Sequence, residues 1–199
     1  MGAVAFSGAI AGASALAFTL IAHAHDGAHT NSAKVLDGQT NAFVARSELS
    51  TLVGEGRFVA LAQLPQPLLI NFWGVDCPPC IAELPLLAEF AKQQPTWTVV
   101  LISTDSADTA RDFLRRRPLP VLPNLLTLKA SANPRASMRA AGNTSGGLPY
   151  TWATKLQLTV GEVSPKSGKS GSAQAITCFT QSGMLDAKDL KAALTACSQ

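Results

Sequence analysis

The sequence predicts an α/β fold in which a mixed central sheet carries helices on both faces. Two short, continuous apolar runs, 67–73 and 97–103, have the composition of strands that are buried on both faces. Each run is followed by a segment with apolar residues at helical spacing. Strand-like segments at 150–155 and 175–180 and a final helix at 184–196 complete a pattern that is typical of a single mixed sheet.

The helices have clear sequence boundaries. The spacing predicts one helix over 81–94 and a second over 105–117, and a proline follows each of them directly. From 118 to 147, Pro, Gly and Asn recur at intervals, and a short helix is predicted only at 133–141.

Composition excludes two classes of protein. Apolar residues make up 47% of the 199 positions and charged residues 15%, which is the opposite of the balance that keeps a chain disordered. The formal charge is +3, and the only basic cluster is Arg115–Arg117. Nucleic-acid partners require basic residues gathered along one face. We therefore expect a folded domain that does not bind nucleic acid.

The N-terminal segment 1–24 is predicted to be an export signal or a membrane anchor. Residues 3–22 are apolar and uncharged, and Ala22-His23-Ala24 fits the small-x-small pattern at which signal peptidases cut. The segment lacks the usual basic start, and it is long enough to cross a bilayer uncut. Cleavage and retention both remain open. Either outcome predicts a periplasmic or other extracytoplasmic location, with a linker at 25–40 and one domain at 41–199.

The sequence Cys77-Pro78-Pro79-Cys80 follows a predicted buried strand and opens a predicted helix. Free N–H groups and the helix dipole favour an anion at a helix N-terminus, so Cys77 should ionise more readily than an ordinary thiol. Cys80 lies one turn inside and is the candidate for the shielded, resolving thiol. The two prolines cost little in a first turn, where the amides lack helical acceptors.

Other uses of the CxxC pair are less well supported. A structural zinc site needs two further Cys or His ligands at compatible spacing, and Cys178 and Cys197 stand alone. His23 lies within the predicted signal segment, and only His25 and His29 lie in the polar linker. No metal site is therefore predicted, and the dithiol is the only redox group expected. A Cu(I)-binding module and a thiol peroxidase remain alternative functions.

Two segments resemble a known family. The sequence LLINFWGVDCPPCIAELP at 68–85 and GGLPYT at 146–151 are similar to the thioredoxin superfamily, and within it to the TlpA/ResA-like exported thiol–disulfide oxidoreductases. The resemblance implies a thioredoxin-like fold and disulfide exchange with protein substrates. It further suggests a reductant, for example of cytochrome c or metal-site cysteines, which receives its electrons from a membrane thiol donor.

The resemblance also implies roles for individual residues. Pro149 would follow a cis peptide bond and pack against the cysteine pair, and Leu148 would offer backbone groups to the substrate. Glu83 would manage the proton of Cys80, as a buried carboxyl with a raised pKa can do. A solvent-facing position on the amphipathic helix is the alternative for Glu83.

Four further positions of the two matching segments complete the predicted active site. Asn71 stands where thioredoxin has a buried Asp, and Asp76 stands where it has Trp; a carboxylate beside Cys77 opposes thiolate formation. Trp73 is expected to pack at the strand end. Tyr150 replaces the usual Thr, and its ring is expected to shape the substrate groove.

The remaining cysteines, Cys178 and Cys197, have three possible states. They could form a structural disulfide between the last strand and the last helix, stay as two separate thiols, or act as a second redox relay. Connectivity cannot be derived from sequence alone.

Overall fold

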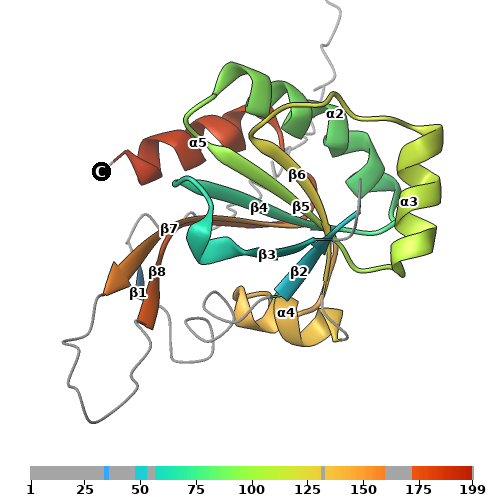
Figure 1. Cartoon of the computed structure of the whole chain (residues 1–199). Coiled ribbons are helices and arrows are strands. Elements are labelled where there is room, and N and C mark those ends of the chain that lie inside the picture. The colour runs from blue at the N-terminus through green and yellow to red at the C-terminus, as the bar shows by residue number, and fades with distance from the viewer. Residues whose placement is uncertain (1–33, 36–47, 53–56, 131–132, 160–171, 199) are drawn as a thin grey trace, which may run out of the picture.

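The computed structural model describes residues 34–35, 48–52, 57–130, 133–159 and 172–198 (Figure 1). The predicted signal or anchor at 1–24 lies outside these ranges. The strands are β1 (Lys34–Val35), β2 (Glu48–Thr51), β3 (Phe58–Ala60), β4 (Leu68–Trp73), β5 (Thr98–Ser103), β6 (Leu125–Lys129), β7 (Tyr150–Thr159) and β8 (Ser172–Ser182). The helices are the 3-10 turn η1 (Leu61–Gln63), α2 (Pro78–Gln93), α3 (Ala107–Arg116), α4 (Pro134–Ala140) and α5 (Ala187–Cys197).

The strands form one mixed sheet in the order β1-β8-β7-β4-β5-β6-β2-β3. β4, β5 and β6 run parallel, and the other pairings are antiparallel. Parallel neighbours need crossover connections, which α2 and α3 supply. α2, α3 and α5 contribute to the hydrophobic cluster on one face, and α4 and η1 contribute to the cluster on the other (Figure 1). The predicted mixed sheet with helices on both faces is confirmed.

The central strand β4 is buried along its whole length. Its side chains alternate between the faces, as a strand requires. Leu69 and Trp73 join the cluster beneath α2, whereas Ile70 and Phe72 join the opposite cluster. Asn71 shares the parity of Leu69 and Trp73 and therefore faces α2.

Four strands differ from the sequence-based expectation. β6 lies inside the 118–147 stretch, where only a short helix is predicted; its five residues pair in parallel with β5, which local spacing does not reveal. β7 and β8 extend well beyond 150–155 and 175–180 and pair over most of their length. β1 pairs with β8 although it falls within the predicted linker.

Candidate active site

Cys77 and Cys80 form a disulfide at the N-terminus of α2, with a Cα–Cα distance of 5.3 Å. Cys77 is the N-cap residue, and its Sγ accepts a hydrogen bond from the backbone N–H of Cys80 at 3.3 Å. Cys77 is half-buried, Cys80 is fully buried, and Pro78 and Pro79 are exposed. An incoming group can therefore reach the first sulfur more easily than the second.

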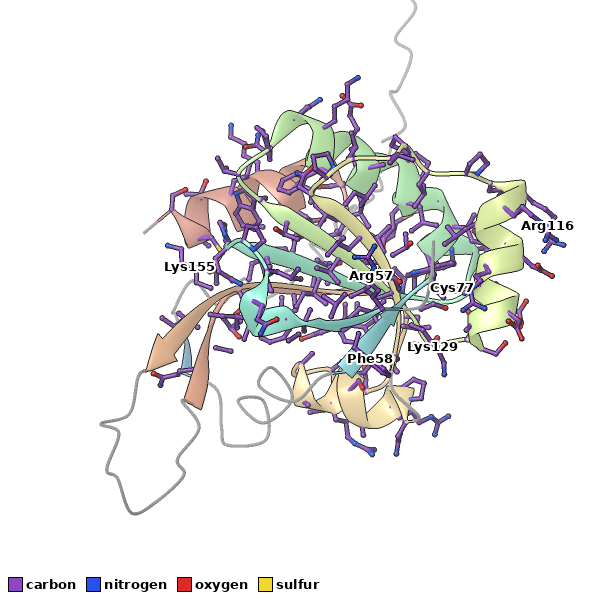
Figure 2. All side chains as sticks on the ribbon, in the orientation of Figure 1. Arg57, Phe58, Cys77, Arg116, Lys129 and Lys155 are labelled. Carbon is purple, nitrogen blue, oxygen red and sulfur yellow. A yellow bond between two sulfur atoms is a disulfide. The ribbon has the colours of Figure 1, made fainter. Side chains whose placement is uncertain are left out.

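The position of Cys77 follows from the sheet. β4, β5 and β6 end together at Trp73, Ser103 and Lys129, which are aligned across the three strands. Cys77 lies just beyond this edge (Figure 2). This is where the ends of parallel strands commonly build functional sites.

The turn between β4 and Cys77 is held in place by Asp105, which lies in the connection between β5 and α3. The backbone N–H of Val75 donates to Asp105 Oδ2 at 2.8 Å, and the backbone N–H of Cys77 donates to Gly74 O at 3.3 Å. Asp76 is exposed beside Cys77. Sequence reasoning did not identify Asp105, because its contact joins positions 30 residues apart.

Trp73 is fully buried and packs against Phe113 of α3, with ring centroids 5.4 Å apart. Its position beneath the active-site turn is that of a packing residue.

Glu83 is buried one turn after Cys80, with 1% of its surface exposed. Asn71 Nδ2 donates to its Oε1 at 2.6 Å, and the backbone N–H of Leu185 donates to its Oε2 at 2.8 Å. Burial raises the pKa of the Glu83 carboxyl, and the hydrogen bonds from Leu185 and Asn71 oppose part of that rise. The alternative of a solvent-facing Glu83 is wrong, because the first turns of α2 pack directly on the sheet.

The opposite side of the site contains a cis peptide bond between Leu148 and Pro149. The Leu148 side chain lies against the active-site turn, since a Cβ placed on Gly74 would be 3.4 Å from its Cδ1. The backbone N–H of Gly183 donates to Pro149 O at 2.9 Å. The structure thus brings the 146–151 segment next to the cysteine turn.

Tyr150 does not line a substrate groove, which corrects the expectation for this residue. Its ring is 3% exposed and lies in the hydrophobic cluster on the far face of the sheet. The hydroxyl donates to Ala141 O at 2.8 Å, and burial raises the pKa of this phenol. Alternation along β7 explains the difference, because Tyr150 and Trp152 share one face and Thr151 takes the face toward α2.

Met184 is an exposed apolar residue that sequence reasoning missed. Its neighbour Gly183 hydrogen-bonds to Pro149, and its other neighbour Leu185 hydrogen-bonds to Glu83. Its side chain is 55% exposed. Met184 is therefore an exposed apolar residue between one backbone contact to the cis-proline segment and another to Glu83.

Comparisons with known proteins agree with this arrangement. A thioredoxin-related protein from Neisseria meningitidis serogroup B superposes with a TM-score of 0.56 at 26% identity, covering 76% of this chain and 100% of that one. The chain described in Figure 1 therefore has a thioredoxin-like fold. The family model described as AhpC/TSA family matches residues 43–129. No curated protein sequence matches the chain.

Two further structures share the thioredoxin-like fold. A thiol:disulfide interchange protein DsbE from Chlorobium tepidum has a TM-score of 0.55 at 17% identity and covers 83% of this chain and 99% of its own. The exposed lipoprotein thioredoxin Etrx1 from Streptococcus pneumoniae has a TM-score of 0.52 at 16% identity. The match covers 77% of this chain and 100% of the Etrx1 chain.

Cys178 and Cys197 form a second disulfide in the thioredoxin-like domain, with a Cα–Cα distance of 5.1 Å. It joins β8 to the C-terminal end of α5, and both cysteines are buried. The two cysteines are therefore bonded to each other and are not two separate thiols.

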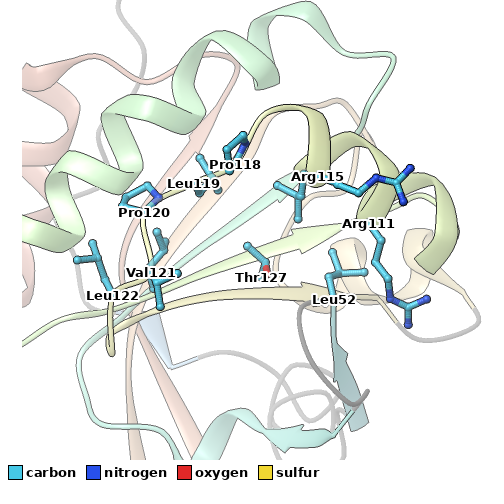
Figure 3. A pocket seen from close by; sticks show the side chains of 11 residues that line it. Leu52, Arg111, Arg115, Pro118, Leu119, Pro120, Val121, Leu122 and Thr127 are labelled. Carbon is cyan, nitrogen blue, oxygen red and sulfur yellow. The ribbon is translucent and has the colours of Figure 1, made fainter.

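A cavity of about 520 Å³ lies between α3, the 118–122 segment and Thr127 of β6 (Figure 3). None of its lining residues belongs to the CxxC turn, to the 146–151 segment or to the surroundings of Glu83.

Within the described ranges, no group of three or more His, Cys, Asp or Glu side chains is placed to hold a metal ion. No helix in those ranges is both long enough and apolar enough to cross a bilayer.

The raised pKa of Glu83 predicts a pH dependence of stability. The folded thioredoxin-like domain keeps the Glu83 proton above the usual value of 4.5, where the unfolded chain has lost it. The free energy of unfolding should therefore fall as the pH rises from 4.5 through the folded pKa, and stay lower above it. Glu83→Gln should remove this fall, so that the variant loses less stability than the wild type between acid and neutral pH.

Urea unfolding between pH 4 and pH 8 measures the effect. Glu89→Gln is the matched control, because Glu89 lies on the exposed side of the same helix. Equal pH slopes for wild type and Glu83→Gln would contradict the prediction.

Proposed function

We propose that this protein is an extracytoplasmic thiol–disulfide oxidoreductase that acts on protein substrates, of the TlpA/ResA-like type. The observation that carries the proposal is the Cys77–Cys80 disulfide at a helix N-terminus, with one sulfur accessible and the other buried. The likeness to a thioredoxin-related protein supports it, as does the disulfide interchange named for the DsbE structure.

The reaction proceeds in two exchanges. In the reduced protein, the Cys77 thiolate attacks a substrate disulfide, forms a mixed disulfide and releases one substrate sulfur as a thiolate. Cys80 then gives its proton to the Glu83 carboxylate and attacks Cys77 Sγ. The substrate leaves with both sulfurs reduced, and the Cys77–Cys80 disulfide forms. Two electrons pass to the substrate for each disulfide opened.

The surface around Cys77 suits a protein chain as substrate. Pro78 and Pro79 directly follow Cys77 and are exposed, Met184 is exposed in the segment that bonds to Pro149, and Leu148 lies against Gly74 of the active-site turn. Backbone groups of Leu148 bind the substrate chain, and the exposed apolar side chains contact the residues beside its cysteine.

Reduction is the direction we propose, with substrates such as apocytochrome c or metal-site cysteines and a membrane thiol donor that returns the electrons. An extracytoplasmic location suits a chain in which all four cysteines are paired. The name of the exposed lipoprotein thioredoxin supports the same location. The N-terminal segment 1–24 would direct export and either be cleaved or remain as an anchor.

A Cys80→Ala variant tests this function. It should leave Cys77 in stable mixed disulfides with its partners, which accumulate on expression in a host with a matching compartment and are identified by mass spectrometry. Cys77→Ala is the control and should trap nothing, because Cys80 is buried.

Three outcomes would count against disulfide exchange. The Cys80→Ala variant could be well expressed and trap no partner. Stoichiometric Cu(I) binding that is lost with either cysteine would favour a metal-binding module. Peroxide consumption as fast as dithiol exchange would favour a thiol peroxidase.

A further inference from the structure

Three buried polar side chains meet between α2 and the sheet. Asn71 of β4, Glu83 of α2 and Thr151 of β7 are each at most 1% exposed. Asn71 and Thr151 are directly opposite each other in the register of β4 and β7. Both therefore point toward the helix that carries Glu83.

The two ends of the Asn71 amide have unequal surroundings. Nδ2 donates to Glu83 Oε1 at 2.6 Å and to Thr151 Oγ1 at 3.0 Å. Oδ1 is buried and has no hydrogen-bond donor among the described residues. A buried acceptor without a donor costs free energy, so a native structure that has one calls for an explanation.

The present orientation suits a charged Glu83. Both carboxylate oxygens accept hydrogen bonds, one from Asn71 Nδ2 and one from the backbone N–H of Leu185. None of the ion pairs within the described ranges includes Glu83. The charge is thus stabilised by N–H groups alone.

A protonated Glu83 needs a different neighbour. Its O–H group must donate, and an amide nitrogen does not accept. Half a turn about the Cβ–Cγ bond of Asn71 brings Oδ1 to the position of Nδ2. Oδ1 then accepts from the Glu83 hydroxyl. The Thr151 hydroxyl both accepts and donates, so it bonds to either end of the amide.

We propose that Asn71 is a positioning residue whose side-chain amide turns over when Glu83 gains or loses its proton. Glu83 then keeps its hydrogen bond to Asn71 in both states. This inference rests on the proposed function, in which Glu83 takes the proton of Cys80 in one exchange and returns it in the next. An amide serves both states of Glu83, whereas an apolar side chain at position 71 would serve neither.

Few other groups near Glu83 titrate. β4 and β7 bring Asn71 and Thr151, which do not ionise. α2 itself brings Cys80, which is in the disulfide in the oxidised protein. The segment before α5 brings Asp186, which is exposed, and the backbone N–H of Asp189 holds the pKa of that carboxyl below its usual value.

The test is a titration of the oxidised protein by NMR from pH 4 to pH 9. The side-chain amide signals of Asn71 should shift with the same midpoint as the Glu83 carboxyl signal, and Glu83→Gln should abolish the shift. Asn143 is the control: it is also buried, but its amide bonds to Gly147 O and to the Gly146 N–H, with no carboxyl as partner. Its signals should not follow Glu83.

An Asn71→Leu variant gives a second measurement. The midpoint of Glu83 should rise by about one pH unit, because a hydrogen bond to a charged group is roughly twice as strong as one between neutral groups. Wild-type Asn71 signals that stay constant while Glu83 titrates would overturn the proposal, as would an unchanged midpoint in Asn71→Leu.

The wild-type titration needs no substitution, so it remains decisive if the leucine variant does not fold. It also needs no substrate and no free thiol. A Cys80→Ala variant that traps nothing would refute the proposed function and leave the turning of Asn71 to be decided by the NMR result.

Discussion

Replacing Cys77 by serine is expected to lower the rate at which the protein reduces a protein disulfide by about 10³-fold or more. This is the scale on which enzymes lose activity when their nucleophile is removed. A hydroxyl does not replace a thiolate as the attacking group, and the other cysteine of the pair, Cys80, is buried. The N–H of Cys80, which contacts Cys77 Sγ in the structure, stabilises negative charge at that position.

The rate is measured with a disulfide-linked fluorescent peptide and a chemical reductant that regenerates the dithiol. Thermal unfolding of Cys77→Ser shows whether the fold is kept. In the wild-type reduced protein, iodoacetamide at pH 7 should label Cys77 faster than a cysteine in an unfolded peptide. Equal labelling rates, or exchange that persists in Cys77→Ser, would refute the role of Cys77 as nucleophile.

Removing the second disulfide is expected to have the largest effect on stability. Cys178 and Cys197 are 19 positions apart, and a cross-link over such a loop stabilises a fold by about 3 kcal/mol. The double variant Cys178→Ala/Cys197→Ala should therefore lower Tm by roughly 6–12 °C in a domain of this size. Loss of buried sulfur contacts in the core would add to the change.

Calorimetry of the oxidised proteins measures this shift, with exchange at Cys77 followed below the lowered Tm. Exchange should persist there, because Cys77 and Cys80 remain paired and α2 is kept. A Tm equal to that of the wild type would show that the Cys178–Cys197 bond does not stabilise the domain.

The sequence was sufficient for the centre of the fold. The buried strands at 67–73 and 97–103 agree with β4 and β5 to within one residue at their first positions, and the helix after the CxxC pair agrees with α2. The periodicity of apolar residues is a local property, so a window of sequence contains it. The placement of Cys77 at a helix start follows from the same pattern.

A short strand and the face taken by a side chain at the start of a strand were harder to predict from the sequence. β6 has five residues, and its pairing with β5 depends on a partner more than twenty positions away. For Tyr150, a strand was predicted correctly but the face was not. Successive strand residues point to opposite faces, so the side toward the helices depends on register with β4.

By itself, the sequence determined that this protein has a mixed α/β fold with a dithiol at a strand-to-helix junction, because these features follow from the spacing of neighbouring residues. Only the tertiary structure decided that Cys178 pairs with Cys197, that Glu83 is buried, and that Asn71 and Thr151 meet beside it. Those contacts join residues 12 to 80 positions apart. They depend on how the strands align and which face of the sheet α2 covers, and no local pattern of residues encodes that alignment.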